Sequence, residues 1–396
     1  MQIYTIFLTF QAGKLKNFGF SFLLFIFLPY LCTIITKRRH TPPHHPTPIT
    51  HHPTPMNKKF AHRYLLPALG CGLVIIGLLY YYFMSDLSAS DKTQYVCIDR
   101  DDNVDSVFAK LTPIANAHAL TGYKTLVRHS GYADHVRTGR YAIEPGDGAL
   151  TVFRHLKNGI QTPVNLTIPS VRTLDRLASA VGRKLMIDSA EVMQALNDPI
   201  VMQKYGYDST TIACLFIPNT YDMYWNISLE NFLDRMKREN NNFWNADRKA
   251  KAQMAGLTEN QVVTMASIID EETANDDEKP MIAGMYLNRL KIGMPLQADP
   301  TIKFALKQFD LKRIWGYMLK TQSPYNTYTN IGLPPGPIRV PSVAGINAVL
   351  DYEHHNYLYM CAKEDFSGTH NFAVTYAEHL KNAERYSKAL NERGIK

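Results

Sequence analysis

Cysteine and concentrated charge are scarce in this 396-residue chain. It has five cysteines, none of them in a CxxC pair, so their spacing predicts neither a disulfide framework nor a zinc site. Lys and Arg outnumber Asp and Glu by 43 to 35, but they are scattered rather than gathered in a stripe, which argues against a nucleic-acid partner. HExxH, GxSxG, Walker and GxGxxG motifs are also lacking, so no metalloprotease, serine hydrolase or nucleotide-binding enzyme is indicated.

What the chain does have is enough apolar material for a sizeable core. Hydrophobic residues make up 45% of it, and its length suggests two or three folding units. No internal repeat is evident at a solenoid period. The chain is therefore expected to be globular outside any membrane segment.

A charge-free segment extends from Tyr64 to Ser85, and its run from Leu65 to Met84 is long enough to cross a hydrocarbon core of about 30 Å. Lysine and arginine precede it at 58, 59 and 63, whereas Asp86 and Asp91 follow it. The positive-inside rule therefore predicts a single-pass anchor over 56–85, with everything beyond it outside the cytoplasm. A cleaved signal peptide is the alternative, although the run exceeds a usual h-region and lacks an A-x-A site.

Residues 1–55 contain a second apolar stretch, from Asn17 to Thr36, and a Pro/His/Thr-rich tract that cannot form a core. Met56 opens MNKKFAHRYLLP, which is typical of a bacterial start. We expect residues 1–55 to be a dispensable extension that arises from an upstream start. An intact mass beginning at Met56 would support this expectation, and a full-length mature protein would oppose it.

Beyond the apolar run, the patterns predict an α+β fold in two parts. Residues 93–165 mix an extended run with helical patterns around a turn-rich GRYAIEPGDG, which predicts a small α+β module. Residues 166–396 form a second region, which begins with amphipathic helices and carries its densest motifs over 257–396.

One helix in this second region ends in three acidic residues. Thr258 and Gln261 have the spacing of a capping box, and apolar residues then recur at helical intervals to about Thr273. Glu272 follows Met265 by seven residues, so its carboxylate extends the apolar face of this helix. Partial desolvation would raise its pKa and make it a general acid near neutral pH. The alternative is an ordinary solvated acidic helix end.

Polar side chains that could contact a substrate follow this helix. Asn288 and Arg289 belong to a helix predicted over about 279–291, and Gln297 and Asp299 follow the turn after it. Amide and carboxylate groups suit sugar hydroxyls, whereas Arg289 could equally hold Asp299 or another acid, and a structural role is favoured for it.

A proline-rich loop supplies further candidates. SPYNTYTN is followed by GLPPGP, whose prolines make the loop rigid. Its aromatic and amide groups could line a groove or merely pack beside the core, and His370 is equally open between a site role and a structural one. The loop candidates are Tyr325, Asn326, Thr327 and Tyr328.

Four stretches in a fixed order resemble the YceG-like endolytic murein transglycosylases: TMASIIDEET at 264–273, MYLNRLKIGMPLQADPT at 285–301, SPYNTYTNIGLPPGPI at 323–338 and THNFAVTYAEH at 369–379. In that family the second carboxylate of an ASI-I/V-E-x-E-T pattern is catalytic, which falls on Glu272. The chain departs from the pattern at Asp270, where glutamate is usual. The resemblance further implies that 93–165 is a LysM-like module and 166–396 a YceG-like catalytic region.

The implied reaction is cleavage of the β-1,4 bond between N-acetylmuramic acid and N-acetylglucosamine inside a glycan strand, leaving a 1,6-anhydromuramyl end. One acid/base carboxylate suffices, so no metal or organic cofactor is expected. The protein would act at the cell (inner) membrane with its catalytic domain facing the periplasm, and would terminate nascent strands beside peptidoglycan synthases. The alternatives are a non-catalytic glycan-binding scaffold and, with less support from ligand spacing, a metal-dependent envelope hydrolase.

Overall fold

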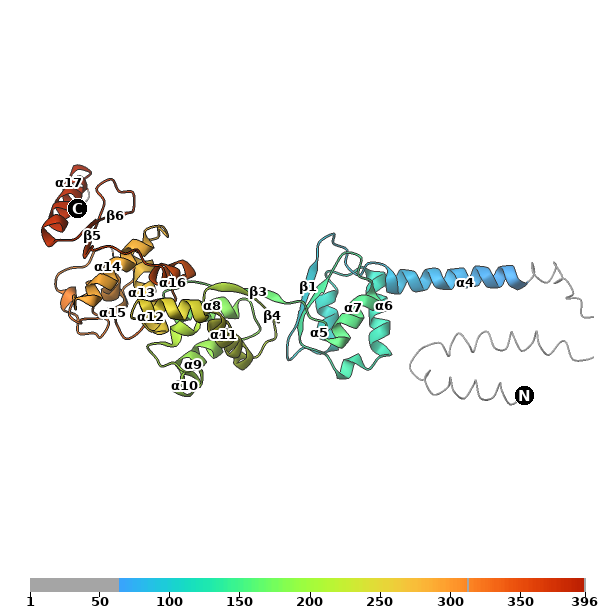
Figure 1. Ribbon diagram of the computed structural model, residues 1–396. Coiled ribbons are helices and arrows are strands. Elements are labelled where there is room, and N and C mark those ends of the chain that lie inside the picture. Colours follow the sequence, from blue (N-terminus) through green and yellow to red (C-terminus); the bar gives the residue numbers. More distant parts are fainter. Residues whose placement is uncertain (1–63, 312, 395–396) are drawn as a thin grey trace, which may run out of the picture. The chain divides into compact units, whose positions relative to one another are not determined.

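The computed structural model describes residues 64–311 and 313–394 (Figure 1). They fall into two compact units, one ending at Thr162 and the other beginning at Pro163. Both units combine helices with two-stranded antiparallel sheets, so the predicted mixture of α and β structure is confirmed. The expectations for residues 1–55 and for the basic positions 58, 59 and 63 lie outside the described residues.

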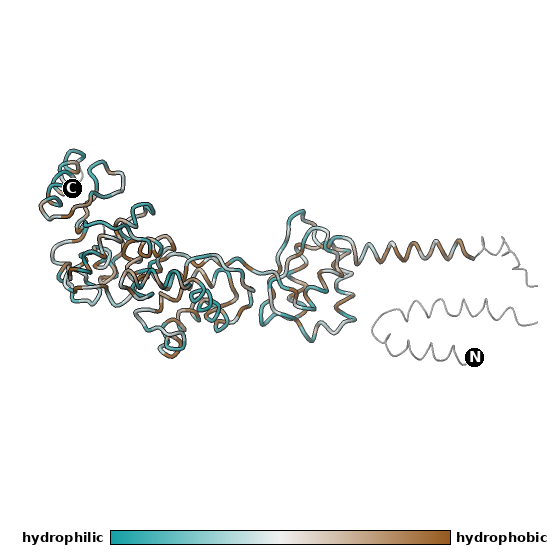
Figure 2. Tube along the Cα trace, in the orientation of Figure 1, coloured by the Kyte–Doolittle hydropathy of each residue, from teal (hydrophilic) through white to brown (hydrophobic). Residues whose placement is uncertain are grey.

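The first unit begins with the apolar helix, formed by α4 (Leu66–Leu79) and a π-helical turn η2 (Tyr80–Met84). Over Leu66–Met84 its mean hydropathy is 1.8, and none of it is buried inside the protein. Figure 2 shows this stretch as a mostly hydrophobic trace. By length and composition, the helix is able to cross a membrane.

The end of this helix packs against the rest of the first unit. The ring of Tyr81 stacks on that of His118 at 4.2 Å between centroids, and Ser85 Oγ lies 2.8 Å from His118 Nε2. Gly122 is required here, because a Cβ at this position would fall 1.9 Å from the carbonyl oxygen of Tyr82. The apolar helix is thus joined to the following module by side-chain packing as well as by the chain.

The remainder of the first unit is a small α+β module. Strands β1 and β2 pair antiparallel from Gln94↔Ile143 to Ile98↔Gly139, and their inward side chains pack with those of three helices into one core. The elements are β1 (Gln94–Ile98), α5 (Val104–Leu111), α6 (Ala117–Arg128), η3 (Tyr132–Asp134), β2 (Gly139–Ile143) and α7 (Ala149–Asn158).

The second unit opens with a two-stranded sheet and a set of helices around it. Strands β3 and β4 pair antiparallel from Val164↔Met223 to Ile168↔Asn219. The helices α8, α9, α10 and α11 each begin at a Thr, Asp or Ser whose side chain accepts a backbone N–H, which satisfies a donor that the helix leaves open. The elements are β3 (Val164–Ile168), α8 (Leu174–Gly182), α9 (Ser189–Asn197), α10 (Pro199–Tyr205), η4 (Ile212–Leu215), β4 (Asn219–Met223) and α11 (Leu229–Phe243).

The rest of the second unit is built around one buried helix. The elements are α12 (Ala246–Met254), α13 (Glu259–Glu272), α14 (Lys279–Lys291), α15 (Asp299–Ala305), η5 (Met318–Lys320), α16 (Val343–Leu350), β5 (Tyr359–Ala362), β6 (His370–Ala373) and α17 (Tyr376–Glu392). Helix α13 packs against α14, α15 and α16, and every residue from Val262 to Ile269 is buried. The predicted capping box of Thr258 and Gln261 is present at its start. Its C-terminal end therefore emerges from the centre of a core.

Candidate active site at the end of helix α13

The three acidic residues that end α13 have different surroundings. Asp270 is almost fully buried and lies 2.7 Å from Lys279 Nζ. It also accepts hydrogen bonds from the backbone N–H and the hydroxyl of Ser342, at 2.5 and 3.0 Å. These contacts fix the start of α16 against α13, so Asp270 has a structural position.

Glu271 is held by two arginines. Arg172 Nε donates to both of its carboxylate oxygens, at 2.8 and 3.0 Å, and Arg339 donates to Oε1 at 2.8 Å. Arg339 also donates to the Ser170 hydroxyl at 2.9 Å. The charge of Glu271 is therefore neutralised in the fold, as expected for a carboxylate held by guanidinium groups.

Glu272 has a different kind of partner. Its Oε1 accepts a hydrogen bond of 2.8 Å from the hydroxyl of Tyr286, which is neutral. Burial raises the pKa of Glu272 to about 7; the hydrogen bond from Tyr286 opposes this effect, and the nearby charge of Asp299 adds to it. The residue as a whole is half-buried, at the surface end of the helix. Glu272 can therefore both give and take a proton near neutral pH.

Tyr286 comes from the middle of α14 and is 1% exposed. Burial and the neighbouring carboxylate raise its own pKa well above the usual range, so it stays a hydrogen-bond donor. Sequence reasoning did not single it out. The sequence contained only a weak indication of its role. A buried tyrosine usually directs its hydroxyl to a hydrogen-bond partner, but the residue pattern does not identify that partner.

Asp299 and Tyr328 form a pair beside Glu272. The Tyr328 hydroxyl donates to Asp299 Oδ1 at 2.5 Å, and burial together with this carboxylate raises the pKa of Tyr328 well above its usual range. Asp299 starts α15 and is exposed, so it presents a negative charge at the rim of the site. Two sequence candidates are thus brought to the same place as Glu272.

Gln297 lies two residues before Asp299 in a backbone conformation unusual for its type. Its φ is 51°, in the left-handed region that costs a non-glycine residue roughly 1 kcal/mol. The backbone N–H donates to the carbonyl of Thr327 at 3.0 Å, and the side chain is exposed. Strained residues of this kind are concentrated at functional sites, which suits the candidacy of Gln297.

The comparison with protein families identifies the fold that carries this site. Residues 96–385 match the model of the YceG-like family. The chain belongs to the YceG-like family. Its resemblance at the sequence level is therefore confirmed, and it extends through both units rather than the four motif stretches alone.

Relatives of this YceG-like chain include two that are named endolytic murein transglycosylase. One, from Bacillus subtilis strain 168, is 27% identical over 340 residues, which cover 81% of this chain and 93% of the relative. The other, from Streptococcus pneumoniae strain R6, is 25% identical over 350 residues, covering 79% of this chain and 62% of the relative. A crystal structure of a YceG-like protein from Listeria monocytogenes matches with a TM-score of 0.50 and 25% identity, over 74% of this chain and 99% of that one.

In this YceG-like structure, Asn288 and Arg289 hold the backbone. The amide of Asn288 donates to the carbonyls of His355 and Tyr357, at 2.7 and 3.1 Å. Arg289 is buried and donates to the carbonyls of Leu358 and Leu296, at 2.6 and 2.5 Å. Among the described residues no ion pair joins Arg289 to Asp299, and these contacts agree with the structural role favoured for Arg289.

The loop candidates divide between support and packing. Asn326 is fully buried; its amide donates to the carbonyls of Leu319 and Thr321, both at 2.9 Å, and its Oδ1 accepts from the Tyr328 N–H. The hydroxyl of Thr327 accepts from the Ala298 N–H at 3.0 Å. These bonds tie the loop to the start of α15, and so position Gln297, Asp299 and Tyr328. Tyr325 instead packs on Phe304, at 4.7 Å between ring centroids.

His370 is paired rather than free. Its backbone N–H and its Nδ1 contact the two carboxylate oxygens of Glu278, at 2.6 and 2.9 Å. Glu278 immediately precedes α14, so this pair joins β6 to the start of that helix. His370 therefore has a structural contact at the start of α14.

Metal ligands do not gather in the part of the chain that the structure describes: no group of three or more His, Cys, Asp or Glu side chains there could hold an ion. His355, one of two adjacent histidines, has Nε2 2.9 Å from the Met281 carbonyl, and its Nδ1 accepts from the Tyr357 N–H at 3.0 Å. Both ring nitrogens are thus engaged with the backbone, which is a structural arrangement.

Proposed function

We propose that this chain is a lytic transglycosylase that cuts inside murein glycan strands, with Glu272 as its catalytic acid and base. One observation carries the proposal. Of three consecutive carboxylates, Asp270 and Glu271 are paired with cations, whereas Glu272 faces a neutral hydroxyl and has its pKa raised to about 7. A single carboxyl poised near neutral pH is what this reaction requires.

The proposed reaction cleaves the β-1,4 bond between N-acetylmuramic acid and N-acetylglucosamine. Glu272 gives its proton to the glycosidic oxygen as the bond from that oxygen to the muramyl anomeric carbon breaks. The C6 hydroxyl of the same muramyl residue then attacks the anomeric carbon and returns its proton to Glu272. The products are a 1,6-anhydromuramyl end and a new N-acetylglucosamine hydroxyl, and neither water nor a cofactor is consumed.

The residues around Glu272 suit the binding of a sugar chain. Gln297 presents an exposed amide from a fixed backbone, and Asp299 with Tyr328 offers further hydrogen-bonding atoms beside it. Arg289, Asn326 and Thr327 act indirectly, since they hold the backbone next to these groups. Asn288 instead holds the segment before β5. The names of the bacillar and streptococcal relatives, both endolytic murein transglycosylases, support the substrate class.

We further propose that Leu66–Met84 anchors the protein in the cell (inner) membrane, with the residues that follow this helix on the periplasmic side. The basic residues before this helix and Asp86 and Asp91 after it support that orientation. The module of β1, β2 and α5 to α7 would act as a LysM-like grip on the strand. Because its α6 packs on the end of the apolar helix, the grip would lie close to the membrane, where synthases release new strands.

Hydrolysis of the glycosidic bond is the second candidate reaction, because Asp299 lies near enough to raise the pKa of Glu272. Two carboxylates are the usual equipment of a glycoside hydrolase, in which the second one activates water or attacks the sugar. Such an enzyme would release reducing ends instead of anhydromuramyl ends. A non-catalytic glycan-binding scaffold would release neither.

The deciding experiment incubates the full-length protein in detergent with polymerised, uncrosslinked glycan strands and identifies the ends by mass spectrometry. Wild type and Glu271→Gln should give anhydromuramyl ends, while Glu272→Gln should give none. Glu271→Gln is the matched control because it makes the same chemical change one residue away. Reducing ends would establish the hydrolase instead, and cleavage by none of the proteins would favour the scaffold.

A further inference from the structure

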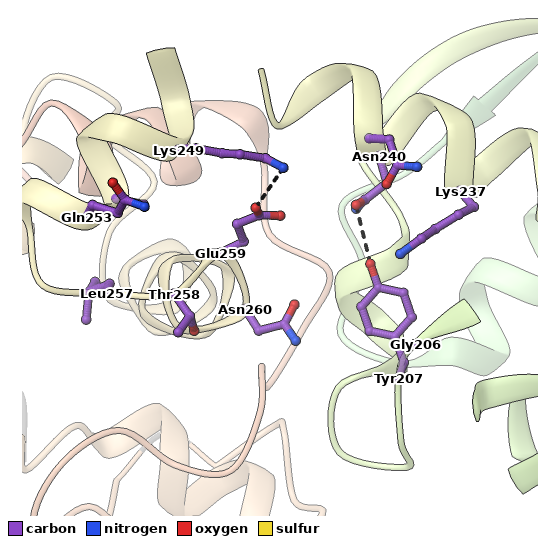
Figure 3. A pocket seen from close by; sticks show the side chains of 12 residues that line it. Gly206, Tyr207, Lys237, Asn240, Lys249, Gln253, Leu257, Thr258, Glu259 and Asn260 are labelled. Carbon is purple, nitrogen blue, oxygen red and sulfur yellow. Dashed lines mark hydrogen bonds and ion pairs between the residues drawn. The ribbon is translucent and has the colours of Figure 1, made fainter. Parts of the chain in front are cut away.

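A cleft lies at the opposite end of α13 from Glu272. It has a volume of about 580 Å³ and opens between α11, α12 and the start of α13. Figure 3 shows Lys237 and Asn240 on one wall, and Lys249, Gln253 and Glu259 on the other. The 14 residues of α13 put this cleft about 20 Å from Glu272, so it cannot hold the bond that is cut.

The ammonium of Lys237 is the unusual group in this cleft. It lies 4.6 Å from the ring centroid of Tyr207, and among residues 64–394 other than 312 it makes no hydrogen bond and no ion pair. Burial lowers the pKa of Lys237; the charge of Glu259 opposes that shift, and Lys249 adds to it. A partly desolvated cation without an acceptor is costly, which suggests that a ligand supplies one.

The other charges of the cleft do not compensate for Lys237. Glu259 is already paired with Lys249, at 3.2 Å. Asn240 is also engaged: its amide donates to the carbonyls of Cys214 and Leu215, and its Oδ1 accepts from the Tyr207 hydroxyl. The cleft therefore keeps an excess of one positive charge, carried by Lys237, and is suited to an anion.

The remaining lining gives the chemistry of that anion. Amide side chains line the cleft and can hydrogen-bond to the N–H and C=O groups of a peptide, as well as to a carboxylate. These amides make no side-chain hydrogen bond within the described part of the chain: Asn241, Gln253 and Asn260. Sugar hydroxyls gain little from a half-buried cation, whereas a carboxylate gains a charge-assisted hydrogen bond from it, so a peptide that carries a carboxylate matches the lining best.

We propose that this cleft is an accessory subsite that binds a carboxylate of a murein peptide stem, with Lys237 as its cationic contact. The inference rests on the proposed function, because only a murein strand would bring such a stem to this surface. The strand is a polymer, so a repeat some distance from the cleaved bond can place its stem in the cleft. The subsite would make the enzyme favour strands whose stems are intact.

Binding tests this inference without requiring cleavage. Full-length Glu272→Gln protein in detergent is titrated with uncrosslinked strands that carry their stems, and with the same strands after an amidase has removed the stems. Adding Lys237→Met should weaken binding of the stem-bearing strands about tenfold, the effect of one charge-assisted hydrogen bond, and should leave the stripped strands unaffected. Lys237→Arg should restore most of the affinity, since it keeps the charge.

Two controls keep the outcomes distinct. Lys388→Met removes an exposed lysine on α17 and should change neither affinity, which separates a local effect from that of net charge. Stems replaced by an unrelated peptide of equal charge should bind more weakly. Equal affinity of Lys237→Met and its parent for stem-bearing strands would overturn the subsite, and equal affinity for both peptides would overturn its assignment to stems. Failure of the proposed function would show separately, as an absence of anhydromuramyl ends from the wild type.

Discussion

The hydroxyl of Tyr286 donates a hydrogen bond of 2.8 Å to Glu272 Oε1, joining the middle of α14 to the last residue of α13. The bond has two opposed effects on the acid/base role proposed for Glu272. It orients the carboxyl, and it stabilises the ionised form, so it offsets part of the rise in the pKa of Glu272 that burial causes. With that pKa at about 7, kcat/KM of the wild type should fall about tenfold per pH unit above this value, because the acid must be protonated to cleave.

Tyr286→Phe should move the alkaline limb of the pH–rate profile, where kcat/KM falls, to higher pH. The substitution keeps the ring but removes the donor that stabilises the carboxylate, so the pKa of Glu272 rises further. The rate at neutral pH should nevertheless fall, by roughly tenfold, because the carboxyl is no longer held in one orientation. Tyr352→Phe is the matched control, since Tyr352 packs on the same core without touching Glu272. A lower rate with an unmoved limb would assign Tyr286 a purely structural role.

Asp299→Asn should move the limb in the opposite direction. The negative charge of Asp299 raises the pKa of Glu272, and asparagine removes that charge while its Oδ1 can still accept from Tyr328. A pH profile of anhydromuramyl production measures the change. Complete loss of activity at every pH would contradict a merely electrostatic role and would favour Asp299 as a second catalytic carboxylate.

Glu272 should also make the folded protein less stable as the pH rises. Its pKa is about 7 when folded against 4.5 for an ordinary glutamate, so its protonated form contributes stability that is complete below pH 4.5 and is lost as the pH rises to about 7. Glu272→Gln does not titrate and should therefore become the more stable protein above pH 7, by at most roughly 3 kcal/mol. Denaturant unfolding of both proteins at pH 5 and pH 8 measures this; an unchanged difference between the two pH values would refute it.

Local sequence patterns predicted helix α13 well, because its determinants are local. The capping box of Thr258 and Gln261 spans three residues, and the apolar spacing that leads to Glu272 covers a single helix. The partners of the acidic residues could not be predicted in this way. Arg172 and Arg339 reach Glu271 over separations of 99 and 68 residues, and nothing in the local spacing specifies that pairing.

Residue type alone also did not separate side chains that bind a substrate from side chains that hold the backbone. Asn288 and Arg289 are good ligands for sugars, but their donors serve backbone carbonyls equally well, and the fold uses them for that purpose. The same ambiguity applies to Asn326 and Thr327. Gln297 differs because its left-handed φ is a property of the tertiary structure and has no counterpart in the residue pattern.

Lys279→Met should be strongly destabilising, because it leaves Asp270 charged and buried. The pair has side chains that are 6% and 3% exposed and lies 2.7 Å apart. Removing one member of such a pair costs roughly 3 to 5 kcal/mol. Adding Asp270→Asn should recover much of that loss, since the amide carries no charge. Urea unfolding of the wild type, both single variants and the double variant gives the coupling free energy between Lys279 and Asp270. Strictly additive changes in the free energy of unfolding would show that the two groups do not interact.

Gln297→Gly separates the backbone strain at position 297 from the binding role proposed for the side-chain amide. Glycine adopts a φ of 51° without steric cost, so the substitution should stabilise the fold slightly, by up to about 1 kcal/mol, although its greater freedom in the unfolded chain offsets part of the gain. It also removes the exposed amide, and kcat/KM on glycan strands should fall about tenfold with no shift of the pH profile. Lys307→Gly is the matched control, because Lys307 is exposed and has a φ of 54°. The control should gain similar stability and keep full activity. If both variants kept full activity, the side chain of Gln297 would have no part in binding the strand, and its strained backbone would serve only the turn into α15.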